Sequence, residues 1–313
     1  MNGKILSVTQ DEYFADPCVT PSLDPSIGNI LVSQSPRHAW YAHPRLGGIK
    51  RKPSQFMDSG SLIHALLLGD GKEIVEIHAK DFKTKVARQQ RDEAHEAGLI
   101  PVLTEEISHA REIIDDVRLE LEDQKINISG GQSEMMVQWE EEATNGNTVL
   151  CRGMLDKFIY ERATIFDVKA VSFGKPEVCQ ANSIKRSDSI QINAYMSGIA
   201  SLHPELMGRL QFVFLFVECL GPSGKLKSDP PYCVSPLQPD GILQELSMRK
   251  WQQAIDLWEE CLRTDTWPGY ADRIISMTAP MWALREYEIS VYPETEVVGE
   301  YTEQEEWKDG DWF

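Results

Sequence analysis

The residues best suited to chemistry lie in one short stretch, GMLDKFIYERATIFDVKAV, which holds Asp156, Asp167 and Lys169. The stretch favours two short strands joined by a turn. Because alternate residues of a strand point to the same face, Asp167 and Lys169 should project together, and the partner strand can bring Asp156 beside them. Two carboxylates can hold a hard divalent cation, and a neighbouring lysine can act on an attacking water. Taken alone, a D-x-K triplet is a weak signal, because such triplets are frequent by chance and a solvated strand end with an ion pair is the simpler interpretation.

Four further residues have types and positions that suit the same chemistry. His64 stands in an apolar helical segment, GSLIHALLL, where it is either a hydrogen-bonded core histidine or a metal ligand. Gln191 and Tyr195 are four residues apart and would share one face of a helix, where they could contact a phosphate. Glu134 stands on an expected strand beside that of Asp156, as a supporting carboxylate or a ligand of a second metal, or as an ordinary surface acid.

The elements that must position these residues are predicted from periodicity and from helix and turn signals. Helices are expected at residues 29–42 with an interruption at Pro36, at 54–68, within 71–100, at 104–123 with Thr104 as N-cap, at 175–202 with a break near Asn182, and at 238–262. Strands are expected at residues 133–139, 148–160, 163–171, 210–220 and 232–236. This order predicts an α/β or α+β domain with a central mixed sheet flanked by helices.

The expected domain organisation is simple. Residues 1–28 form an N-terminal arm, residues 29–285 the main domain, and residues 286–313 an acidic tail. The six cysteines are scattered without a C-x-x-C pair, so we expect reduced thiols. No apolar run approaches the length of a membrane span, and the first residues lack the layout of a signal peptide, so we expect a cytoplasmic protein and no membrane partner.

A formal charge of −18 is unusual for a protein that binds nucleic acid, but half of it lies in the acidic tail, which has ten acidic residues and one lysine. Basic residues cluster elsewhere, in two short segments at 36–52 and 80–91. These segments are either a track for DNA or ordinary solvated surface. The candidate DNA-binding residues are Arg37, Arg45, Lys50, Arg51, Lys52, Lys83, Lys85 and Arg88.

The joint pattern resembles a known family. The order G-x-x-x-H, G-x-x-D, D-x-K and Q-x-x-x-Y is similar to the RecB-like branch of the PD-(D/E)XK nuclease superfamily. Residues 27–46 (IGNILVSQSPRHAWYAHPRL), the segment 209–217, and the segments TDTWP and APMWA further resemble RecE-like, exonuclease VIII-type nucleases of phages and prophages. The resemblance covers about residues 25–290; Leu155 stands where the superfamily name has proline, a departure common in the superfamily.

The resemblance implies a PD-(D/E)XK core and a role for each matching residue. His64, Asp156, Asp167 and the Val168 carbonyl would bind Mg²⁺, for which Mn²⁺ should substitute, while Lys169 would act on the attacking water. Gln191 and Tyr195 would support Lys169 and the scissile phosphate.

The resemblance also implies an activity and partners: 5′→3′ digestion of linear double-stranded DNA that leaves 3′ single strands for recombination by annealing in a bacterial host. A ring-shaped homo-oligomer, trimeric or tetrameric, and a RecT-type annealing protein would be its partners.

Two alternatives remain open at this point. One is a RecB-like or Cas4-like nuclease with another DNA specificity, although Cys219, Cys233 and Cys261 are too widely spaced for the iron–sulfur cluster of Cas4-type members. The other is a non-catalytic DNA-binding or assembly protein on a nuclease scaffold.

Overall fold

The computed structural model describes residues 3–49, 55–69, 73–186 and 188–286. Of these, the residues up to Tyr270 form one compact unit, and those from Ala271 to Glu286 belong to a second unit that contains α10 (Met281–Glu286). Among the described residues, no helix is both long and apolar enough to cross a membrane.

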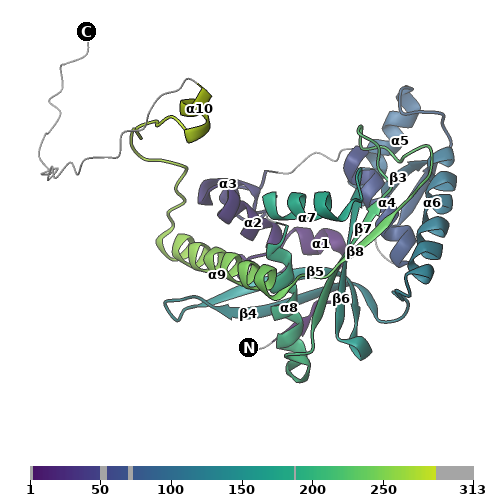
Figure 1. Ribbon diagram of the computed structural model, residues 1–313. Helices are drawn as coiled ribbons and strands as arrows, with labels where there is room; N and C mark the ends of the chain where they lie inside the picture. The colour runs from purple at the N-terminus through teal and green to yellow at the C-terminus, as the bar shows by residue number, and fades with distance from the viewer. Residues whose placement is uncertain (1–2, 50–54, 70–72, 187, 287–313) are drawn as a thin grey trace, which may run out of the picture. The chain divides into compact units, whose positions relative to one another are not determined.

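A six-stranded mixed sheet forms the centre of the first unit (Figure 1). Its strand order is β1-β4-β5-β6-β7-β8. All neighbours are antiparallel except β6 and β7, which run parallel. The strands are β1 (Lys4–Ile5), β4 (Gln132–Glu142), β5 (Thr148–Ile159), β6 (Thr164–Val171), β7 (Gln211–Glu218) and β8 (Val234–Leu237).

Helices cover both faces of this sheet. One face packs against α2 (Pro25–Ser33), α3 (Pro36–Ala42), α8 (Ile190–Leu202) and α9 (Gly241–Thr264), and the buried core between them includes Trp139, Trp251 and Trp258. The other face packs against α4 (Gln55–Leu68) and α6 (Thr104–Asp123). β7 contributes Phe214 to the first core and Leu215 to the second, as expected of a strand that is buried on both sides. The predicted mixed sheet flanked by helices is confirmed.

Several local predictions differ from the structure. The expected arm contains β1, which pairs with β4, and α1 (Gln10–Phe14), while α2 begins already at Pro25. A parallel pair, β2 (Ile74–Ile77) and β3 (Ile100–Leu103), flanks α5 (Lys85–Glu96) in a region expected to be loop and helix. The long helical region is broken between α7 (Pro176–Lys185) and α8, later than Asn182.

The predicted N-cap of α6 is wrong by one residue. Leu103 is the N-cap and Thr104 is already helical. The Leu103 N–H donates to the carboxylate of Glu106, the third helical residue, 3.3 Å away, which is the half of a capping box that does not depend on the side chain of the N-cap.

Candidate metal and catalytic site

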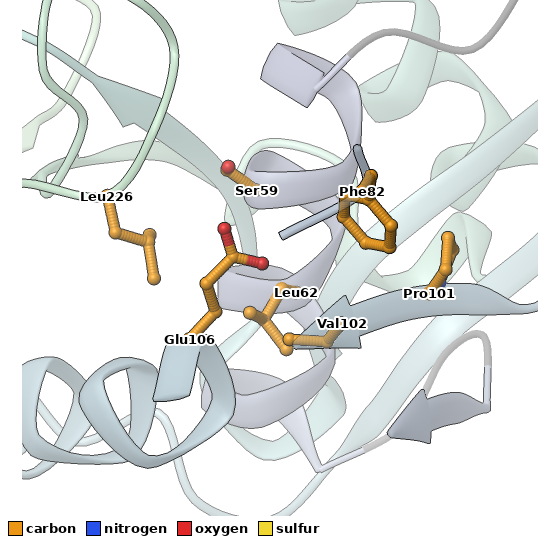
Figure 2. Close-up of a pocket in the computed structure, with 7 residues that line it drawn as sticks. All are labelled: Ser59, Leu62, Phe82, Pro101, Val102, Glu106 and Leu226. Carbon is orange, nitrogen blue, oxygen red and sulfur yellow. The ribbon is translucent and has the colours of Figure 1, made fainter. Parts of the chain in front are cut away.

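Ser59 and Leu62 of α4 line a pocket that contains none of the candidate catalytic residues (Figure 2). Its polar groups are the Ser59 hydroxyl and the Glu106 carboxylate, and the other lining residues are Leu62, Phe82, Pro101, Val102 and Leu226. None of the candidate site residues lines it. The candidate catalytic site instead includes His64, further along the same helix.

A fork between two strands creates the candidate site. β5 and β6 pair only from Lys157–Phe166 to Ile159–Thr164, whereas β6 pairs with β7 along its whole length. Beyond Phe166 the ladder between β5 and β6 ends, and the Val168 N–H donates instead to the Asp156 carboxylate, 2.7 Å away. A side chain thus replaces the missing strand partner, because a buried N–H without an acceptor would be costly. Asp156 is thereby fixed at the mouth of the fork.

His64 approaches this fork from α4, which covers the sheet face opposite α8. Its neighbours Ile63 and Leu67 are buried against the sheet, which anchors α4, while the His64 side chain is partly exposed. Its Nε2 lies 2.6 Å from the Val168 carbonyl oxygen, and its Nδ1 lies 3.7 Å from the Asp156 carboxylate. Nε2 therefore carries the proton in this arrangement. The imidazole, the Val168 carbonyl and Asp156 converge on one small region.

Glu134 joins them through an irregularity in β4 and β5. The ladder between these strands skips one position, where Glu134 stands opposite Asp156, and pairing continues on both sides. Glu134 has a left-handed backbone with φ of 49°, a conformation that costs a non-glycine residue about 1–3 kcal/mol and occurs often at functional sites. On β5, Leu155 and Phe158 both face the core with α8, so the alternation of the strand breaks between them. The pairs on either side keep the same register, so no residue is inserted, and the break changes only where the side chains of the two strands point.

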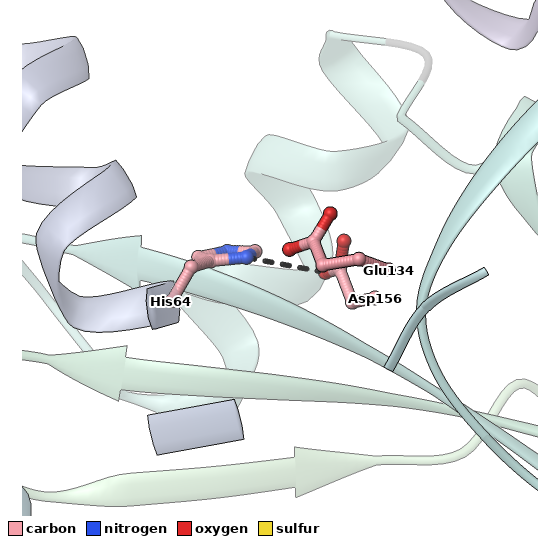
Figure 3. A group of neighbouring side chains, drawn as sticks. All are labelled: His64, Glu134 and Asp156. Atoms are coloured by element: carbon pink, nitrogen blue, oxygen red, sulfur yellow. Dashed lines mark ion pairs between the residues drawn. The ribbon is translucent and has the colours of Figure 1, made fainter. Parts of the chain in front are cut away.

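The result is a cluster of one imidazole and two carboxylates (Figure 3). One ligand atom from each of His64, Glu134 and Asp156 lies within 4.8 Å of the other two, and all three residues are partly buried. Carboxylate and carbonyl oxygens suit Mg²⁺, and an added imidazole suits Mn²⁺ as well. The donor set therefore fits a divalent cation. Asp167 is not part of this three-residue cluster, whereas Glu134 is.

Asp167 and Lys169 form the neighbouring half of the site. The Lys169 ammonium lies 2.6 Å from the Asp167 carboxylate, so the two side chains project together as the strand pattern predicts. Asp167 is buried, and this burial, with the charge of Asp156, raises its pKa to about 6 against the effect of Lys169. Burial disfavours the charged form of Lys169, but the carboxylates of Asp167 and Asp156 outweigh it and raise the pKa of the ammonium. Lys169 therefore remains charged at neutral pH.

Gln191 and Tyr195 lie on α8, and Tyr195 is close enough to Asp167 for that carboxylate to affect its pKa. Burial, followed by the charge of Asp167, raises the pKa of Tyr195 well above its usual value, so its phenol stays protonated as a donor. The Gln191 amide donates to the Tyr195 hydroxyl, 3.5 Å away. Gly153 makes room for the ring, since a Cβ there would lie 3.1 Å from Tyr195 and 3.2 Å from Trp139. This contact explains the glycine in the G-x-x-D pattern.

The described candidate DNA-binding residues lie on α3 and α5 and in the turns beside them. Arg37 is exposed on α3, while Arg45 uses its guanidinium to bind the Cys18 carbonyl at 2.5 Å and lies 3.7 Å from Asp16. Lys83 forms an exposed ion pair with Asp81, and Arg88 donates to the carbonyls of Phe82 and Lys83. Lys85 is exposed at the start of α5. Lys50, Arg51 and Lys52 lie outside the described residues. DNA binding by these residues stays a prediction, and the contacts of Arg45 give it a structural task.

A buried polar network next to the site has no counterpart in the sequence prediction. Arg152, on β5 four residues before Asp156, donates to the Asp24 carboxylate at 2.6 Å and to the Ser22 carbonyl. Asp16 lies 3.5 Å from Arg152 and 3.3 Å from His43, and all three side chains are almost fully buried. The network ties residues 16–43 to the strand that carries Asp156. No local pattern signals it, because its members are up to 136 residues apart.

No family model and no curated protein matches this sequence. Among solved structures, a protein from Eubacterium rectale named as a candidate exonuclease aligns with a TM-score of 0.56 at 11% identity, covering 89% of this chain and 98% of the other. A phage-related exonuclease from Haemophilus somnus aligns with a TM-score of 0.30 at 16% identity, over 65% of this chain and 95% of the other, which is too low to compare sites. The first alignment shows a shared fold.

Proposed function

We propose that this protein is a metal-dependent nuclease of the PD-(D/E)XK type, and specifically an exonuclease that digests linear double-stranded DNA. The observation that carries the proposal is the convergence of His64, Glu134, Asp156 and the Val168 carbonyl beside the Asp167–Lys169 ion pair. The fold shared with a protein that is named as a candidate exonuclease supports the same conclusion.

Each residue has a task that its surroundings suit. His64, Asp156, Asp167 and the Val168 carbonyl would hold a divalent cation, with Glu134 as an additional ligand. When bound, Mg²⁺ would polarise the scissile phosphate and make a coordinated water more acidic. Lys169, held as a cation by Asp167, would orient the attacking water and offset the charge that develops on the phosphate. Tyr195, kept protonated, and Gln191 would donate hydrogen bonds to a phosphate oxygen or to the water.

Digestion of end-labelled linear duplex DNA tests the proposal. Wild-type protein should release nucleotides in Mg²⁺ or Mn²⁺ and none in EDTA. Asp156→Asn should lower the rate by about a hundredfold or more, because it weakens both the cation site and the hydrogen bond that Asp156 accepts from the Val168 N–H. Asp116→Asn is the matched control, since Asp116 is an exposed acid on α6 and its loss should leave the rate unchanged. Equal digestion by wild type and Asp156→Asn would refute the site, and binding without digestion by any of them would favour a DNA-binding protein.

The finer parts of the proposal rest on the sequence resemblance to RecE-like nucleases. They are 5′→3′ polarity, 3′ single-stranded products, a trimeric or tetrameric ring and a RecT-type annealing partner. Duplexes labelled separately at each 5′ end and each 3′ end would establish the polarity, and light scattering would establish the mass in solution. Loss of the 3′ label before the 5′ label would contradict the proposed polarity, and a monomeric mass would contradict the ring.

A further inference from the structure

Helix α1 contributes a side chain to the metal cluster from a part of the chain that the motif pattern does not include. The Gln10 amide donates to the Glu134 carboxylate at 3.0 Å, a contact between residues 124 positions apart. Glu134 is the cluster member with the left-handed backbone. A carboxylate on an irregular strand needs further contacts to stay in one orientation, because the ladder no longer determines where its side chain points.

The helix itself is firmly placed, so the contact is not a chance encounter of two flexible side chains. Thr9 and Glu12 form a reciprocal capping box at its N-terminus. Tyr13, on the same helix, is buried with its ring 5.4 Å from the Arg152 guanidinium. α1 is therefore held against β5, and the preceding strand β1 is held against β4. Both strands that carry the cluster carboxylates thus determine the position of Gln10.

We propose that Gln10 is a positioning residue of the metal site, which holds the Glu134 carboxylate toward His64 and Asp156. The N-terminal segment is then a functional part of the site. The inference rests on the cation site of the proposed function, but it concerns metal binding and can be tested without DNA. Hydrogen-bonding partners of metal ligands commonly change metal affinity by about 10- to 100-fold.

Titration of Mn²⁺ into the full-length protein by calorimetry measures this directly. Gln10→Met keeps the length and bulk of the side chain but lacks the amide donor, and it should weaken Mn²⁺ binding by about tenfold or more with the thermal melting temperature kept close to that of wild type. Gln124→Met is the matched control, since it removes another glutamine–glutamate hydrogen bond of 3.0 Å, to Glu120 on α6, together with a bond to the Val234 carbonyl. Its Mn²⁺ affinity should equal that of wild type.

A charge-swapped double variant separates positioning from simple attachment of the helix. Gln10→Glu with Glu134→Gln restores a hydrogen bond between the same two positions but removes the carboxylate from the cluster strand. If Gln10 positions a ligand, this variant melts like wild type and still binds Mn²⁺ weakly. Full recovery of Mn²⁺ affinity in the double variant, or wild-type affinity in Gln10→Met, would overturn the inference. Wild-type protein that binds no Mn²⁺ would overturn the cation site and the inference together, whereas weak binding by Glu134→Gln but normal binding by Gln10→Met would overturn the inference alone.

Discussion

The buried Asp16 carboxylate makes the free energy of unfolding of the protein depend on pH. Burial opposes its ionisation, but hydrogen bonds from His43 and Ser22 and the charge of Arg152 outweigh burial and lower the pKa of Asp16 from 3.8 to about 2. The difference between 3.8 and 2 is close to 2 pKa units, which corresponds to about 2 kcal/mol of folding free energy.

The direction of this pH dependence follows from the lowered pKa of Asp16 in the folded state. Asp16 contributes its full stabilisation above the pKa of the unfolded chain, near 4, and loses it as the pH falls through the folded pKa, near 2. By pH 3 the contribution should have dropped by about 1 kcal/mol. Asp16→Asn removes the titrating group, so the gap in stability between wild type and the variant should be widest at pH 6 and narrow by this amount at pH 3.

Urea unfolding of both proteins, followed by tryptophan fluorescence at pH 6, 5, 4 and 3, measures the gap directly. Trp139, Trp251 and Trp258 are buried in the core and report on the unfolding of the unit. A gap that stays constant from pH 6 to pH 3 would refute the reasoning, because it would mean that Asp16 binds its proton equally well in both states. A difference in unfolding free energy between wild type and Asp16→Asn that grows toward pH 3 would contradict the predicted direction of the pH dependence.

Three further predictions concern glycines and the site lysine. Gly153→Ala should destabilise the protein by about 1–3 kcal/mol, measured by urea unfolding, because its Cβ would press on Tyr195 and Trp139; unchanged stability would mean that the packing there is looser than described. Gly60→Ala should instead stabilise the protein by about 1 kcal/mol, because alanine favours the helix α4 and its Cβ would meet no atom within 4 Å. A loss of stability would mean that the added Cβ clashes with a neighbour. Lys169→Arg should abolish most DNA cleavage but keep DNA binding, measured by digestion and by gel shift, because a planar guanidinium cannot replace the compact ammonium beside Asp167; near-normal cleavage would remove Lys169 from the chemistry.

The sequence predicts the frame of the site well because strong local patterns determine it. The continuous apolar run of β7, the D-x-K strand β6 and the apolar helix with His64 are each defined by contiguous residues. The juxtaposition of Asp167 and Lys169 follows from strand alternation alone, and the structure bears it out.

The features that sequence reasoning missed depend on contacts between distant residues. The left-handed conformation of Glu134 has no local signal, since glutamate seldom adopts it and no glycine stands at this position. Gln10 stands in a segment rich in polar residues that predicts an irregular arm, and the pairing of β1 with β4 and the contact of Tyr13 with Arg152 place it near the cluster. The Arg152 network is hidden for the same reason, because its acidic partners lie in that segment.

Mn²⁺ soaked into a crystal of the protein would show whether the fork between β5 and β6 binds a cation, because the anomalous signal locates the ion without reference to activity. We expect an anomalous peak at the Asp156 carboxylate, with the His64 imidazole, the Val168 carbonyl oxygen and the Glu134 carboxylate close by. The peak should disappear in Asp156→Asn crystals. A well-ordered site with no Mn²⁺ at this position, or with Mn²⁺ bound only elsewhere, would contradict the assignment of a catalytic metal centre to the fork between β5 and β6.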